Sequence, residues 1–148
     1  MTIGSVRTTV TVAITPDEAF EVFTDEMPAW YRRGAASLGR REGEATMRLE
    51  PEVGGRVLRT GPDGVDVAIG QVTAWDPGRR LCFVDQNDTE VEVRFERDGD
   101  GDGDSTRVVL EHRGLDRLPD DVAASLAQYG WRRLALWFET HQRMKERR

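Results

Sequence analysis

The chain alternates short segments in which every second residue is apolar with turns rich in glycine, proline and aspartate. In Val6–Ile14 and Glu90–Arg97 the apolar side chains fall on one parity, which predicts strands with one buried face. The turn sequences Gly61–Gly64 and Asp76–Gly78 predict hairpins. Further strands are expected at Ala45–Glu50, Arg56–Thr60, Val65–Trp75, Leu81–Asp85 and Thr106–Arg113, with a bulge or bend at Gly70.

Three segments have the sequence signals of helices. Thr15 precedes Pro16, so Thr15 is expected to cap the first turn of a short helix. A second short helix is expected over Glu26–Arg33, and a long helix from Pro119 to about Lys145, where apolar residues recur at helical spacing. This order of elements predicts an α+β fold, in which a curved antiparallel sheet packs against the long C-terminal helix. We expect a single domain covering residues 1–148.

Charge and hydropathy exclude several classes of partner. The 148 residues carry a net charge of −6. An acidic surface repels phosphate backbones, so we expect no nucleic-acid partner. No apolar run approaches the roughly 20 residues that a transmembrane helix needs, and Met1–Val12 lacks the pattern of a signal peptide. We therefore expect no membrane partner and a cytoplasmic location, with a weak homodimer as one open alternative for the oligomeric state.

The sequence contains no convincing pattern for metal or nucleophilic chemistry. Cys82 is the single cysteine and lies in the middle of a predicted strand, so we expect it to pack in the fold or to be partly exposed, and not to be an activated nucleophile. The two histidines, His112 and His141, each lack a second metal ligand at helical or strand spacing. Asp98–Asp104 alternates Asp and Gly, but no register satisfies both the glycine and the final glutamate of a calcium-binding loop. We therefore expect a solvated hairpin tip, no bound metal and no cofactor.

Polar residues share the parity of buried apolar ones on three of the predicted strands. Val57 has the parity of Arg59, Phe83 has that of Asp85, and His112 has that of the leucine two residues before it. If the apolar members face inward, Arg59, Asp85 and His112 converge on one cavity. A buried carboxylate must then be paired or protonated, and Arg59 is the first expected partner, with His112 second. The alternative is that each polar residue lies at a strand end and reaches solvent.

A series of local motifs narrows the fold further. They are Glu50–Arg56, Gly61–Gly64, Gly70–Val72, Asp76–Phe83, Thr106–His112 and Gly130–Trp131. The predicted order of helices and strands resembles the START-like (SRPBCC) superfamily with its helix-grip fold, and these motifs narrow the resemblance. Within that superfamily the chain is similar to the branch related to the activator of the ninety-kilodalton heat-shock protein ATPase. The resemblance implies a cavity between the sheet and the C-terminal helix, which relatives use for lipids, polyketides, hormones or other apolar ligands.

One departure from the family pattern implies a polar cavity. Relatives often have an aromatic residue where this chain has Asp85. The residues expected to line the cavity are Trp30, Tyr31, Val57, Arg59, Ile69, Phe83, Asp85, Val93, His112, Trp131 and Leu134. For Trp30 and Trp131, plain core packing is the alternative. The resemblance implies no catalytic set.

Three functions remain open at this point. The first is a module that binds an apolar or amphipathic small molecule in the cavity. The second is an enzyme of the cyclase, dehydratase or hydrolase kind, with Asp85 or His112 as the acid or base. The third is a co-chaperone-like domain for protein interaction. We disfavour the third function because the eukaryotic co-chaperone has an additional N-terminal domain.

Overall fold

The computed structural model describes residues 4–27, 46–61, 63–85, 88–98, 105–125 and 138. The strands are β1 (Ser5–Val12), β2 (Thr46–Leu49), β3 (Arg56–Thr60), β4 (Asp66–Asp76), β5 (Arg80–Asp85), β6 (Glu90–Arg97) and β7 (Thr106–Arg113). The helical segments are α1 (Pro16–Asp25), the 3-10 turn η1 (Leu115–Arg117) and α4 (Asp120–Ser125). Every strand that the alternation predicts is therefore confirmed.

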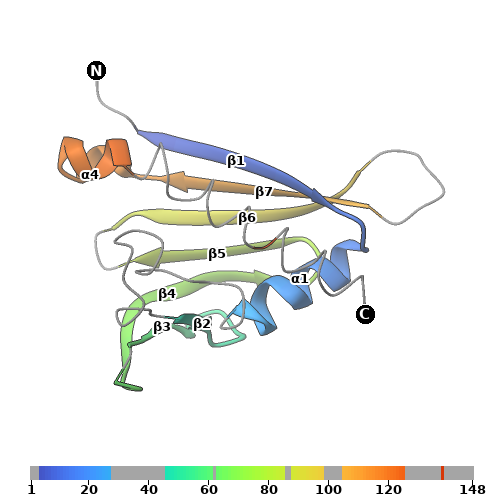
Figure 1. Ribbon diagram of the computed structural model, residues 1–148, viewed down its shortest axis with the longest axis horizontal. Helices are drawn as coiled ribbons and strands as arrows, with labels where there is room; N and C mark the ends of the chain where they lie inside the picture. The colour runs from blue at the N-terminus through green and yellow to red at the C-terminus, as the bar shows by residue number, and fades with distance from the viewer. Residues whose placement is uncertain are drawn as a thin grey trace.

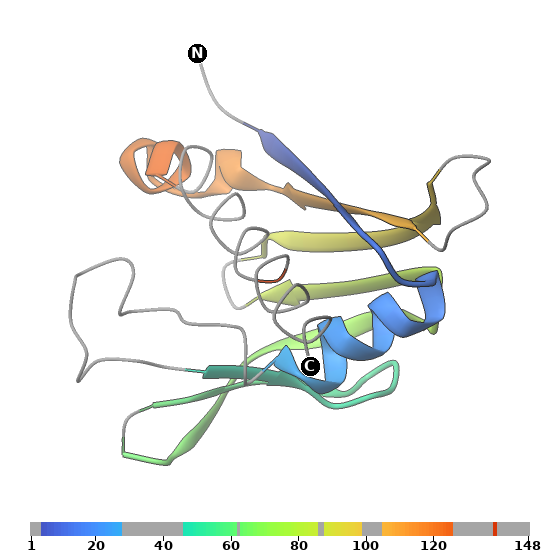
Figure 2. The ribbon, with the colours of Figure 1, turned by 45° about the vertical axis from the view of Figure 1, so that its right-hand side comes forward.

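The seven strands form one antiparallel sheet in the order β1-β7-β6-β5-β4-β3-β2. From β2 to β7 each strand pairs with the next along the chain, whereas β1 pairs with β7, so that β1 and β2 form the two edges of the sheet. The sheet is curved, and α1 lies on its concave side (Figures 1 and 2). This architecture confirms the predicted curved antiparallel sheet of the helix-grip fold.

Local sequence explains where α1 begins. The Thr15 hydroxyl accepts a hydrogen bond from the backbone N–H of Glu18 at 3.2 Å and donates one to its carboxylate at 2.9 Å. Pro16 occupies the first turn, where no backbone N–H is needed, so the predicted cap and start are confirmed. The buried side of the helix consists of Ala19, Phe20, Val22 and Phe23.

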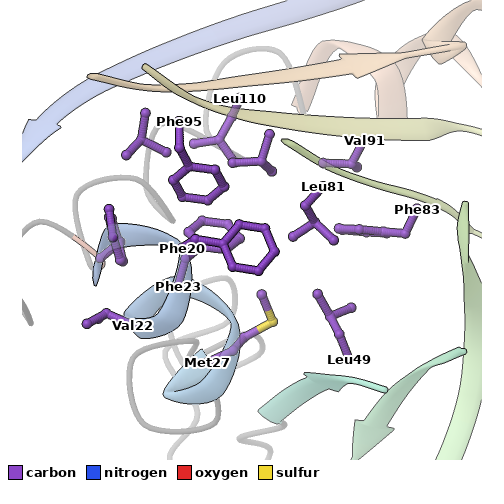
Figure 3. Close-up of a cluster of buried hydrophobic side chains, with 14 of the residues drawn as sticks. Phe20, Val22, Phe23, Met27, Leu49, Leu81, Phe83, Val91, Phe95 and Leu110 are labelled. Atoms are coloured by element: carbon purple, nitrogen blue, oxygen red, sulfur yellow. The ribbon is translucent and has the colours of Figure 1, made fainter. Parts of the chain in front are cut away.

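The core lies between α1 and the face of the sheet that α1 covers, which we call the inner face (Figure 3). Phe23 packs edge-on against Phe95 of β6, with ring centroids 5.7 Å apart, and against Phe138, at 5.3 Å. Phe138 is helical and fully buried. The core therefore joins α1, the middle of the sheet and a residue near the C-terminus.

β4 has a bulge at Gly70, as predicted. The register between β3 and β4 shifts here and leaves Ile69 as an extra residue. A Cβ atom on Gly70 would lie 2.2 Å from the carbonyl oxygen of Val84 in β5. Since such an approach is sterically forbidden, only glycine lets the two strands pair this closely. Gly70 is paired with Asp85 of β5, so the bulge lies beside a candidate site residue.

Several predictions fall on other parts of the chain. Of the predicted helix from Pro119 to Lys145, the structure describes α4 and Phe138. Most of the predicted helix over Glu26–Arg33 and most of the Asp–Gly loop lie outside the described residues. These predictions stay open.

Candidate functional site

The inner face of the sheet is apolar over its central strands. Cross-strand pairing places Leu81 of β5 beside Val93 of β6, and Val93 beside Leu110 of β7. The next row contains Phe83, Val91 and His112. The apolar side chains of both rows are almost completely buried and point toward α1 (Figure 3). His112 therefore adds a titratable side chain to the second of these otherwise apolar rows.

A polar cluster, consisting of Asp85, Thr89 and His112, ends the apolar rows. The Asp85 carboxylate accepts a hydrogen bond from the backbone N–H of Thr89 at 3.1 Å. The Thr89 hydroxyl lies 2.8 Å from Nε2 of His112, so these two groups share a hydrogen bond whose direction depends on the histidine tautomer. Thr89 and His112 are both buried. Thr89 thus contacts the Asp85 carboxylate through its backbone N–H and the buried imidazole of His112 through its hydroxyl.

Backbone geometry at two neighbouring turns fixes the polar cluster. Asp88, in the connection between β5 and β6, has a positive φ of 61°. Gly114, just after β7, has a φ of 83°, and a Cβ atom there would lie 3.2 Å from the carbonyl oxygen of Asp88. The guanidinium of Arg117 donates a hydrogen bond to the same oxygen. Left-handed backbone at both turns therefore lets the end of β7 approach the β5–β6 connection closely.

Burial controls the protonation of His112. It lowers the pKa of His112 from the usual 6.5, because the charged form loses its hydration, while the negative charge of Asp85 acts in the opposite direction. Neutral imidazole can accept a hydrogen bond at one nitrogen and donate at the other. At neutral pH the polar cluster is accordingly a set of hydrogen-bonding groups with one carboxylate, at the end of an apolar face.

The sequence matches one family over most of its length. Residues 4–136 match the family described as polyketide cyclase / dehydrase and lipid transport. The chain belongs to this family. No curated protein gives a significant match.

Solved structures support the same placement. The anthrahydroquino-gamma-pyrone synthase Txn09, solved in a complex with SUM, is 30% identical, with 84% of this chain and 85% of that chain covered and a TM-score of 0.56. Protein NE0264 from Nitrosomonas europaea is 11% identical, with 98% and 97% covered and a TM-score of 0.67. CalU16 from Micromonospora echinospora is 20% identical, with 93% and 73% covered and a TM-score of 0.57. The last two show the fold alone. The family match, together with the likeness to Txn09, confirms the START-like superfamily.

In this member of the polyketide cyclase family, the structure brings some of the expected site residues together. Asp85 and His112 are joined through Thr89, and Val57, Phe83 and Val93 are buried in the core. Ile69 packs against that core from the β4 bulge. Trp30, Tyr31, Trp131 and Leu134 lie outside the described residues.

Arg59 lies in β3, two residues after Val57. Its side chain is exposed, and it is paired with Met47 of β2 and Val67 of β4. Val67 is itself 45% exposed, because this end of the β3–β4 hairpin extends beyond the core (Figure 2). The contacts described for Asp85 and His112 include their hydrogen bonds with Thr89.

Thr89 is the site residue that sequence reasoning missed. It lies two residues before Val91, on the inward parity of β6, but just outside the predicted strand. Continuing the alternation of β6 to the inward-facing position just before the predicted strand would have identified Thr89.

The outer face of the sheet carries an ion-pair network centred on Glu92. Its carboxylate accepts hydrogen bonds from Arg80 of β5 and from Arg113 of β7. Arg113 also pairs with Glu90 and Glu111. The hydrogen bond from Arg80 is the main cause that lowers the pKa of Glu92, against the opposing effect of burial. Long side chains of both charges thus cover this face.

Cys82 lies beneath this network. Its thiol is 3.9 Å from a Glu92 oxygen, and its side chain is 1% exposed. Burial raises the pKa of the thiol. Cys82 therefore packs within the fold, as the sequence predicts, and lacks the features of an activated nucleophile.

No helix among the described residues has the length and apolar character that crossing a membrane requires.

We expect His112 to make the stability of the protein depend on pH below 6.5, its usual pKa. Because the pKa of folded His112 is lower, the unfolded chain takes up this proton first, and stability falls as pH decreases from 6.5 toward the folded value. His112→Gln removes the titrating imidazole and with it this pH dependence of stability. Urea denaturation at neutral and mildly acidic pH should show a larger loss of stability in the parent than in the variant. Equal losses would contradict the prediction.

Proposed function

We propose that this protein binds a largely apolar small molecule against the inner face of the sheet, with the polar end of the ligand at the polar cluster. The observation that carries the proposal is the position of Asp85, Thr89 and His112 at the end of an otherwise apolar face. Ligand sites typically combine apolar walls with a few convergent polar groups. The family description names polyketide chemistry and lipid transport, both of which involve largely apolar molecules.

A titration with naphthol tests this function. Naphthol combines an apolar ring system with one hydroxyl, so we expect saturable one-to-one binding by the purified full chain. Thr89→Val keeps the shape of the side chain but removes its hydroxyl. We expect it to weaken naphthol binding about five- to tenfold, since one hydrogen bond contributes about 1 kcal/mol.

The matched control is Thr9→Val. Thr9 is an exposed threonine of β1 on the outer face, and the same replacement there should leave naphthol affinity unchanged. Circular dichroism verifies that both variants are folded. Absence of saturable binding by the folded parent would refute the proposed function. If the two variants changed naphthol affinity equally, the polar cluster would have no specific role in binding.

A second candidate function is catalysis at the same site. Its support is the 30% identity to an anthrahydroquino-gamma-pyrone synthase over 84% of this chain. On this proposal His112, neutral because of its lowered pKa, is the base and Asp85 is the second proton carrier. A ligand that is chemically changed during the incubation would favour catalysis, whereas one recovered unchanged favours binding.

The finer expectations also remain proposals. They are a START-like domain over residues 1–148, a cytoplasmic location, a weak homodimer, and membership of the branch related to the activator of the ninety-kilodalton heat-shock protein ATPase. A binding assay with that chaperone tests the branch. Sedimentation analysis tests the homodimer.

A further inference from the structure

We infer that Thr8 of β1 is a second polar anchor of the site on the inner face, and that it selects ligands with an oxygen at each end of an apolar body. This inference rests on the proposed function and adds the number and spacing of the polar groups on the ligand. It follows from one buried hydroxyl that the packing of β1 does not need.

Thr8 is the polar member of the inward-facing residues of β1, a strand that is described throughout. The inward residues on either side of it, Val6 and Val10, pack against the core. Pairing with Leu110 of β7 places Thr8 at the β1 end of an apolar row of the inner face. The side chain of Thr8 therefore lies on the face that the proposed ligand would contact.

The Thr8 hydroxyl is buried, and the part of the chain that the structure describes contains no hydrogen-bond partner for it. A buried hydroxyl in this state lowers stability. Valine has the same branched shape, favours strands as strongly and has no polar atom to satisfy, so packing gives no reason for the hydroxyl. A ligand oxygen that shares a hydrogen bond with Thr8 would remove the cost.

Thr8 and the polar cluster form two separate polar points on the inner face. Val6 is paired with His112, and Thr8 with Leu110, so Thr8 and His112 occupy diagonal positions on neighbouring strands. Such positions lie about 7–8 Å apart in an antiparallel sheet. A rigid molecule of two fused rings with an oxygen at each end is long enough to reach both points, whereas two adjacent oxygens are not.

Naphthol and two naphthalenediols test the inference on the purified full chain. One diol carries its hydroxyls at opposite ends of the ring system, and the other carries them on adjacent carbons. We expect the parent to bind the opposite-end diol about fivefold more tightly than naphthol, since its second hydroxyl gains a hydrogen bond with Thr8. Thr8→Val should abolish this preference. The affinity for the adjacent diol should not depend on residue 8, because both of its hydroxyls lie at the polar cluster.

Two matched variants isolate the hydroxyl. Thr9→Val makes the same replacement at the next residue, on the outer face, and should keep the preference for the opposite-end diol. Thr8→Ser retains a hydroxyl at the inward position and should keep it as well. The inference is overturned if the parent binds the opposite-end diol no more tightly than naphthol, if Thr8→Val retains the preference, or if Thr8→Ser loses it. Failure of naphthol and both diols to bind would refute the proposed function itself, so the two failures are distinguishable.

A measurement without ligand checks the state of the hydroxyl independently. Removing a buried hydroxyl that has no partner should raise the midpoint of urea denaturation or leave it unchanged, so Thr8→Val should be at least as stable as the parent. A lower midpoint for Thr8→Val would show that the hydroxyl already has a partner in the unliganded protein, and this result would overturn the inference.

Discussion

Phe23→Ala is expected to lower the free energy of unfolding by about 3–5 kcal/mol, the cost of truncating a buried phenylalanine. Phe23 is 1% exposed and packs edge-on against Phe95 and Phe138. Its removal leaves a cavity between α1, β6 and Phe138, which a rigid sheet cannot close by relaxation. Denaturation in guanidinium chloride, followed by circular dichroism, measures the effect.

The control for this substitution is Val122→Ala in α4. Val122 is 42% exposed, so its truncation should change the free energy of unfolding by less than about 0.5 kcal/mol. A cost below about 1 kcal/mol for Phe23→Ala would mean that α1 does not close the core in solution.

Glu92→Ala is expected to cost about 2–3 kcal/mol, because it removes a buried carboxylate and leaves several arginines without their shared partner. Glu92 is 8% exposed and accepts hydrogen bonds from Arg80 and Arg113. The estimate stays below the cost of breaking a fully buried pair, since both arginines are partly exposed. Glu96→Ala is the matched control on the same strand. Glu96 pairs with Arg107 at an exposed position, so this change should cost less than about 1 kcal/mol.

Acid should erase the difference between the parent and Glu92→Ala. The pKa of folded Glu92 is lowered from the usual 4.5, chiefly by the hydrogen bond from Arg80. The contribution of Glu92 to the free energy of unfolding is therefore complete above pH 4.5, and it is lost as the pH falls through the lower pKa of the folded state. Denaturation curves of both proteins at neutral pH and in acid measure this convergence. A difference that stays constant on acidification would show that lost packing, not lost charge, causes the destabilisation.

The strands and the start of α1 could be predicted from the sequence because their signals are local. Successive side chains of a strand point to opposite faces, so the alternation around Val93 reveals both the strand and its buried side. Thr15 and Pro16 mark the helix start through hydrogen bonds within one turn. Gly70 was recognisable as a bulge because glycine inside a strand has few other uses.

The candidate site could be predicted only in part, because parity says which face a residue occupies but not what lies opposite. Asp85 and His112 were expected to approach each other, and they do so through Thr89. Arg59 has the parity of a buried residue, yet it is exposed because its hairpin end extends beyond the core.

By itself the sequence determined the strand order along the chain, the apolar inner face and the polar character of one end of that face, since each follows from spacing over a few residues. Only the tertiary structure decided which polar groups meet. Thr89 bonds to His112 because antiparallel pairing of β6 and β7 places Val91 beside His112, and the turn before β6 then positions the threonine. The sorting of arginines to the outer face likewise depends on glutamates from neighbouring strands, and contacts between residues so far apart in sequence exist only once the sheet has formed.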